Sequence, residues 1–121
     1  ILVNGQEPDT RGVRSVNENG RVWGAVLCIL EWLQTVIPDA FRYDWNAAGG
    51  RLTLHSGGHT VTAQVGVTHL LVDGRENLMD GQPYMTAEGA LVMEVNALIP
   101  HIAGTRTQYD DKVNVLRIET E

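Results

Sequence analysis

The amino-acid sequence predicts an α+β domain of two ββαββ-like repeats, in which short antiparallel strands curl around two helices. Three observations support this: short segments recur at a nearly constant offset, turn dipeptides separate strand-like segments, and each copy contains one helix-like segment. We expect residues 1–121 to form a single domain, with repeat one at residues 1–54, a connecting hairpin at 55–69 and repeat two at 70–118.

The recurrence is clearest in three pairs of segments. Val-Asn-Gly at residues 3–5 returns as Val-Asp-Gly at 72–74, and Ile-Leu at 29–30 returns as Leu-Ile at 98–99, both at an offset of 69. Leu-Thr-Leu at residues 52–54 matches Leu-Arg-Ile at 116–118 at an offset of 64. A loop at residues 34–41 absorbs the five-residue difference. A shared offset over separate elements predicts a duplicated unit.

Turn dipeptides and alternating residues define the expected strands. Asn-Gly at residues 4–5 and Asp-Gly at 73–74 accept positive φ and therefore favour tight turns. Thr60, Thr62 and Gln64 alternate with apolar residues, which is the period of a half-buried strand. The expected strands are residues 1–4, 13–16, 41–46 and 51–55 in repeat one, 60–65 in the connector, and 70–73, 76–79, 106–109 and 113–118 in repeat two.

The first helix is predicted at residues 25–34, where Val26, Ile29, Leu30 and Leu33 form one apolar stripe. The apolar arc is wider than a surface helix needs, so the helix is either wrapped by sheet or completes an interface with a partner. The second helix is weaker, because Pro100 should lie within its first turn or kink it; this helix is predicted to begin near Asn96, whose side chain can cap it, or to be very short.

Composition excludes several classes of function. The 121 residues carry 9 basic and 15 acidic side chains, which argues against nucleic-acid binding because phosphate contacts need clustered Lys and Arg. The longest wholly apolar run, residues 25–30, is far shorter than the roughly 20 residues of a membrane span. A single cysteine excludes an internal disulfide. What remains is an acidic, self-folding domain.

No motif for catalysis or for a cofactor is evident. His55 and His59 bracket a Gly-Gly turn and are weak candidates for a metal site, but no third or fourth ligand is nearby in the sequence. Ordinary surface histidines are the expected alternative. Cys28 lies on an apolar helix shoulder and Ser56 in no nucleophile elbow, so we expect no catalytic residue and no enzyme.

Three aromatic residues are candidates for binding. Trp23, Tyr43 and Tyr84 are not fixed in the core by the repeat pattern, whereas Trp45 and Tyr109 occupy equivalent positions and are expected to pack against the helices. Rings on an exposed sheet face would suit stacking on sugars or binding a protein. Packing in the core or at its rim is the alternative for each ring.

The motif set resembles the copper amine oxidase N-terminal-like domain, also called the stalk domain. The matching motifs are Val-Asn-Gly at residues 3–5, Asn-Gly-Arg at 19–21, Trp-Asn at 45–46, Leu-Thr-Leu at 52–54 and Val-Asp-Gly at 72–74. The resemblance implies a non-catalytic domain, without the copper or quinone of the oxidase, in bacterial cell-wall or secreted proteins. It also implies an antiparallel sheet curled around a helix.

We therefore expect a non-catalytic accessory module of a longer cell-envelope or secreted protein, beginning here at Ile1 as a segment of its parent chain. It would act as a spacer, or associate with a protein or with a second copy through strand edges and the apolar helix face. The alternative is a module that binds cell-wall glycan, peptidoglycan, and targets an attached hydrolase through Trp23, Tyr43 or Tyr84.

Overall fold

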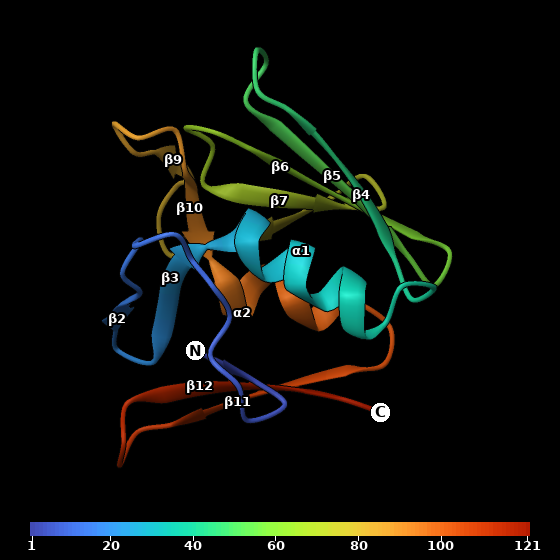
Figure 1. The fold of residues 1–121 in the computed structure, drawn as a ribbon. Coiled ribbons are helices and arrows are strands. Elements are labelled where there is room, and N and C mark those ends of the chain that lie inside the picture. Colours follow the sequence, from blue (N-terminus) through green and yellow to red (C-terminus); the bar gives the residue numbers. More distant parts are fainter.

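Strands form most of the regular structure in the computed structural model, which describes residues 1–121 and arranges the strands in three sheets (Figure 1). The five-stranded sheet contains, in spatial order, β4 (Arg42–Asn46), β5 (Arg51–Ser56), β6 (His59–Gln64), β7 (His69–Val72) and β8 (Arg75–Leu78). The four-stranded sheet contains β2 (Val16–Glu18), β3 (Arg21–Ala25), β10 (Leu91–Glu94) and β9 (Tyr84–Met85). The three-stranded sheet contains β1 (Leu2–Val3), β12 (Val115–Thr120) and β11 (Thr105–Asp110).

The helices lie between the sheets. Figure 1 shows the five-stranded sheet on one side of α1 (Val26–Val36) and α2 (Val95–Leu98), and the three-stranded sheet on the opposite side. Strands β3 and β10 pair antiparallel and run directly into α1 and α2. The four-stranded sheet therefore lies at the beginning of both helices.

The apolar stripe predicted for the first helix faces the core. Val26, Ile29, Leu30 and Leu33 of α1 are buried. They belong to one cluster with residues of every sheet, including Leu54 of the five-stranded sheet. The wide apolar arc of this helix is therefore explained by its position among the sheets. The helix ends at Val36, two residues before Pro38, which cannot continue it.

The predicted fold class was wrong. The chain is mostly β, with 45% of its residues in strands of three sheets and 15% in two short helices, so an α+β fold of two ββαββ-like repeats around two helices is not supported. The five-stranded sheet joins β4 and β5 to β7 and β8 without interruption, although residue 70 was the expected start of the second unit. Pairing of β1 with β12 and of β3 with β10 further links distant segments.

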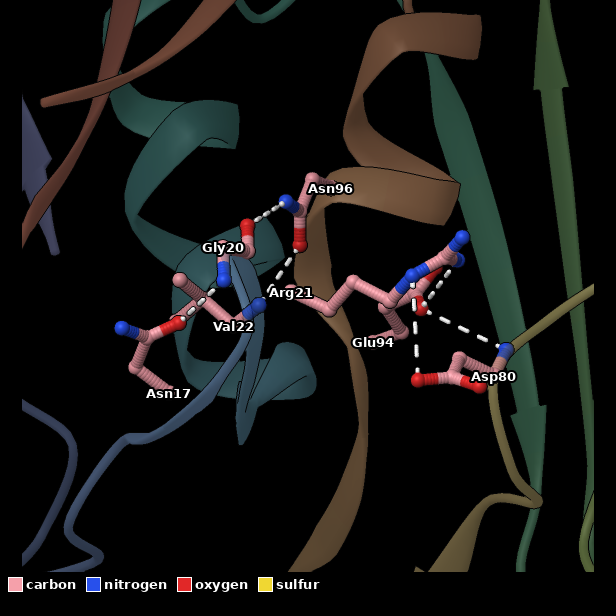
Figure 2. Close-up of polar contacts among 7 residues, drawn as sticks. All are labelled: Asn17, Gly20, Arg21, Val22, Asp80, Glu94 and Asn96. Carbon is pink, nitrogen blue, oxygen red and sulfur yellow. Dashed lines mark hydrogen bonds and ion pairs between the residues drawn. The ribbon is translucent and has the colours of Figure 1, made fainter. Parts of the chain in front are cut away.

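The second helix is shorter than a usual helix, and Asn96 does not cap it. Helix α2 has four residues and continues into a 3-10 turn, η1 (Ile99–His101), with Pro100 in its first positions. The N-cap is Glu94, which makes no capping hydrogen bond. Instead, the Asn96 side chain accepts a hydrogen bond from the Val22 amide at 2.8 Å and donates one to the Gly20 carbonyl at 2.8 Å (Figure 2).

Two of the predicted turns have the backbone conformation that their sequences favour. Asn4 and Gly5 have φ of 49° and 79°, and Asp73 and Gly74 have φ of 51° and 82°. The turn at residues 73–74 joins β7 to β8 and pairs Val72 with Arg75. No helix has the length and apolar character that crossing a membrane requires.

Candidate functional site

Strand β8 is an edge strand whose outer side is free. It follows β7 after the two-residue turn and pairs with no other strand. All four of its residues, Arg75–Leu78, are exposed. An unpaired edge presents backbone donors and acceptors to any chain that can add a further strand.

The register of the β7–β8 hairpin identifies which backbone groups are free. In a two-residue hairpin the pair that closes the turn, here Val72 and Arg75, exchanges backbone hydrogen bonds, and bonded and non-bonded pairs then alternate. After Val72 with Arg75, the next hydrogen-bonded pairs should be Leu70 with Asn77 and then Thr68 with Met79. The Met79 amide does donate to the Thr68 carbonyl, at 2.8 Å, which agrees with this alternation. The amides and carbonyls of Glu76 and Leu78 therefore point away from β7.

Apolar side chains accompany this free edge. Leu78 is 82% exposed and Leu71 is 38% exposed. The register pairs Leu71 with Glu76 and His69 with Leu78, so all four side chains lie on the outer face of the five-stranded sheet, away from buried Leu70. The β8 edge, meaning Arg75–Leu78 with Leu71 beside it, combines unpaired backbone groups with exposed apolar surface.

The candidate metal residues His55 and His59 lie on the β5–β6 hairpin, where His55 pairs with Thr60 and Ser56 with His59. The Nδ1 atom of His59 lies 2.6 Å from Oδ2 of Asp73, and the Thr60 amide donates to Oδ1 of Asp73 at 2.9 Å. These contacts, first the backbone hydrogen bond and then His59, lower the pKa of Asp73. Asp73 therefore holds the His59 ring.

An open hollow of about 560 Å³ lies beside this hairpin, and His55, His59 and Arg42 are among the residues that line it. No group of three or more His, Cys, Asp or Glu side chains is arranged to hold a metal ion. The Ser56 hydroxyl has a structural role, because it donates a hydrogen bond to the Ala40 carbonyl at 2.7 Å and accepts one from the Ala103 amide at 2.9 Å. His55 and His59 therefore lie at one open hollow, where the Ser56 hydroxyl is used in hydrogen bonds to the backbone.

The environment of His101 predicts that the stability of the domain depends on pH. Burial, and then the nearby charge of His59, lowers the pKa of His101 below the ordinary value of about 6.5, although Asp73 opposes this effect. The unfolded chain therefore binds this proton at a higher pH than the folded protein does, so stability is lost as the pH falls from about 6.5 through the folded-state value. We expect His101→Gln to reduce the fall in Tm between about pH 8 and pH 5. Thermal unfolding of both proteins at the two pH values measures this, and an equal fall in Tm would contradict it.

The three candidate aromatic residues lie in different settings. Trp23 is only 7% exposed and lies between Val16 of β2 and Glu94 of β10. Tyr43 faces the core side of its sheet, stacks with Phe41 at a centroid distance of 6.2 Å and has a pKa raised by burial. Tyr84, on β9, is 46% exposed. The three rings therefore form no common exposed surface.

Trp23 is covered by the loop that follows β8. A Cβ atom on Gly81 would lie 3.0 Å from Cη2 and Cζ2 of the indole, so the loop backbone packs directly on the ring. Gly81 has a φ of +125°, which side-chain-bearing residues rarely adopt. The Nε1 atom of Trp23 is buried and has no hydrogen-bond partner. A buried N–H without a partner is uncommon in proteins.

A buried acidic residue, Glu94, anchors the same loop (Figure 2). Its side chain is 5% exposed and lies 3.2 Å from Nη1 of Arg21, and it accepts a long hydrogen bond of 3.4 Å from the Asp80 amide. Nε of Arg21 lies 3.7 Å from Oδ2 of Asp80. A buried carboxylate needs such partners because its charge is otherwise unfavourable in the interior. The three residues hold the loop against the four-stranded sheet.

The sequence interpretation missed the roles of Glu94 and of the β8 edge. An acidic residue inside the apolar run at residues 91–95 was the available signal for Glu94. The Asp-Gly turn at residues 73–74 and the polar segment after it predicted a strand at 76–79, but whether that strand is central or at an edge depends on strand order. Comparisons with family models, with curated proteins and with solved structures found no match to this chain.

Proposed function

We propose that this domain is a non-catalytic association module of a longer protein, and that it joins two copies of the chain through the β8 edge. The observation that carries the proposal is Leu78, which is 82% exposed on a strand whose outer backbone groups have no partner strand. Exposed apolar side chains on an unpaired edge are the feature that folded proteins generally avoid unless another chain covers it.

The charge pattern of β8 selects one pairing of the two copies. A two-fold axis perpendicular to the sheet makes the strands antiparallel and keeps the same face outward in both copies. Centring this axis on Asn77 places Glu76 opposite Leu78 of the second copy, so the free backbone groups of both residues form hydrogen bonds. Centring it on Glu76 would place two like charges opposite one another, which is unfavourable. The proposed pairing is therefore the one around Asn77, which extends two five-stranded sheets into one.

The pairing is expected to be weak. It adds a short row of backbone hydrogen bonds, each contributing about 1 kcal/mol net, and covers part of Leu78. The loss of translational and rotational freedom on association opposes these gains. Copies held close together, on one surface or in one parent chain, would raise the effective concentration and make a weak contact useful.

The setting proposed for the module follows from the family resemblance. The motifs at residues 3–5, 52–54 and 72–74 are similar to those of the copper amine oxidase N-terminal-like domain, which supports a place in a bacterial cell-envelope or secreted protein beside other domains. The glycan-binding alternative has less support, because stacking on sugars needs open ring faces. Trp23 is covered by a loop and Tyr43 packs on the core.

Replacing Leu78 with lysine tests the proposed association. We expect the wild-type chain to show a rising average mass in sedimentation equilibrium as its concentration approaches the millimolar range, and L78K to remain a monomer. Charged residues, lysine above all, discourage pairing at a sheet edge. Val113→Lys is the matched control, because Val113 is also an exposed apolar residue but lies in the turn between β11 and β12. A wild-type chain that stays monomeric, or an L78K variant that associates equally well, would overturn the proposal.

A further inference from the structure

We infer that the association through the β8 edge is controlled by pH through His69 and Glu76, and that it strengthens as the pH falls from about 8 to about 5.5. The inference rests on the proposed function, because it concerns the same pairing of two β8 strands around Asn77. It adds the groups whose protonation regulates that pairing. Nε2 of His69 lies 3.8 Å from Oε1 of Glu76, on the face of the sheet where Leu78 is exposed.

Glu76 is the charged side chain that β8 places on the outer face of the five-stranded sheet. The register puts Glu76 opposite Leu71, and it puts His69 opposite Leu78. His69 and Glu76 are therefore diagonal neighbours on one face, a spacing that long side chains bridge. In the single copy the Glu76 side chain is 75% exposed, so water solvates its carboxylate whether or not the imidazole is charged. The single copy thus gains little from a charge on His69.

The pairing around Asn77 removes part of the water around this carboxylate. Glu76 then lies between Leu71 of its own copy and Leu78 of the second copy. The two-fold axis also brings the two Glu76 residues to within about 7–8 Å of each other, as diagonal neighbours across the new strand pair. A carboxylate between two leucines and near a second carboxylate is unfavourable unless a cation compensates its charge.

His69 is the group that can supply this positive charge. The residues that the neighbouring strand β6 places on this face beyond His59 are uncharged, namely Thr60, Thr62 and Gln64. Four other charged residues lie on the surrounding elements, each with another partner or on another face: Arg51 on β5, which contacts Gln64, Asp73 at the far end of β7, which contacts His59, Asp80 after β8, which contacts Arg21, and Arg75 on the opposite face of β8. The charge on Glu76 is therefore compensated by a protonated His69.

The sign of the pH effect follows from proton linkage. An imidazole ordinarily gains its charge near pH 6.5 and a carboxylate loses its charge near pH 4.3, so the two form an ion pair between these values. Because the associated state gains more from the charge on His69 than the single copy does, it binds more protons, and association strengthens as the pH falls. Exposed ion pairs are weak, so we expect a Kd about threefold to tenfold lower at about pH 5.5 than at about pH 8.

Sedimentation equilibrium at the two pH values tests the inference with the wild type and three variants. His69→Gln should associate as weakly at the lower pH as at the higher one. Glu76→Gln removes the charge that needs compensation, so at the higher pH it should associate about as tightly as the wild type does at the lower pH, and it should lose most of the pH response.

His55→Gln is the matched control. The chain has a net charge of −6, so a proton on any histidine lessens the repulsion between two copies. His55 lies on the same sheet but is in none of the ion pairs of the structure. H55Q retains His69 and should therefore keep the pH response of the wild type. Far-ultraviolet circular dichroism at both pH values shows that each protein is folded.

The failure of this inference and the failure of the proposed function give different results. A wild type that associates equally at both pH values, or an H69Q variant that responds to pH as H55Q does, would overturn the control by pH and leave the association itself standing. A wild type that stays monomeric at both pH values up to millimolar concentration would overturn the proposed function, and this inference with it.

Discussion

Replacing Leu30 with alanine is expected to lower the free energy of unfolding by about 3–5 kcal/mol. Leu30 is fully buried in the middle of α1, where the core cluster joins the helix to residues of all three sheets. Removing its side chain loses the burial of its apolar atoms and leaves a cavity that surrounding sheets cannot easily fill. Urea unfolding of both proteins, followed by circular dichroism, measures the difference.

Leu27→Ala is the matched control for this prediction. It removes the same side-chain atoms at a position three residues earlier on the same helix, but Leu27 is only partly buried at the rim of the core. We expect its effect to be less than half that of L30A, since less surface is lost and solvent can fill the space. Equal effects for the two variants would contradict the placement of α1 between the sheets.

Asn96→Ala is expected to lower the free energy of unfolding by about 2–4 kcal/mol. The Asn96 side chain links α2 to the β2–β3 turn through the Gly20 carbonyl and the Val22 amide (Figure 2). Alanine leaves both partly buried backbone groups without a partner, and each such group costs about 1–3 kcal/mol. Urea unfolding gives the change in stability, and hydrogen exchange at the Val22 amide should become faster.

Asn77→Ala provides the comparison for N96A. Asn77 is exposed on β8, and its side chain makes one long contact of 3.4 Å with the Arg75 carbonyl. We expect N77A to change stability by less than about 0.5 kcal/mol. If N96A were as mild as N77A, the Asn96 contacts would not be the link between the helix and the turn.

The elements that local sequence patterns determine were predicted well. The stripe of Val26, Ile29, Leu30 and Leu33 predicted a helix at residues 25–34, and α1 spans Val26–Val36. Alternation predicted the strand at residues 60–65, where β6 lies, and strands were also predicted at 41–46 and 51–55, where β4 and β5 lie. Periodicity needs only neighbouring residues, so it is readable without knowing the fold.

The fold class could not be obtained in the same way. Pairing of β1 with β12 joins residues more than one hundred positions apart, and pairing of β3 with β10 joins the middle of one expected repeat to the other. Such pairings are selected by burial of the whole core rather than by local preference. The weak second helix, by contrast, was readable locally: Pro100 lacks the amide that a helix interior needs, and α2 has four residues followed by a 3-10 turn that carries Pro100 in its first positions.

In the candidate sites, too, the features that depend on neighbouring residues were predictable from the sequence, whereas contacts between distant segments were not. The hairpin turn between His55 and His59 was readable from its glycine pair, but the contact of His59 with Asp73 depends on the neighbouring strand β7. Trp23 was a candidate either for an exposed binding ring or for packing in the core or at its rim, and the loop at Gly81 covers it. The binding roles of Trp23, Tyr43 and Tyr84 stay predictions, and Tyr84 is the most exposed of the three rings.

Amide hydrogen exchange along β8 tests the proposed association most directly. At low protein concentration the amides of Glu76 and Leu78 should exchange rapidly, because both point away from β7, while the Asn77 amide is protected by its pairing with Leu70. As the concentration rises, we predict that exchange slows at Glu76 and Leu78 and stays unchanged at Asn77. Rapid exchange at Glu76 and Leu78 at every concentration would contradict the account.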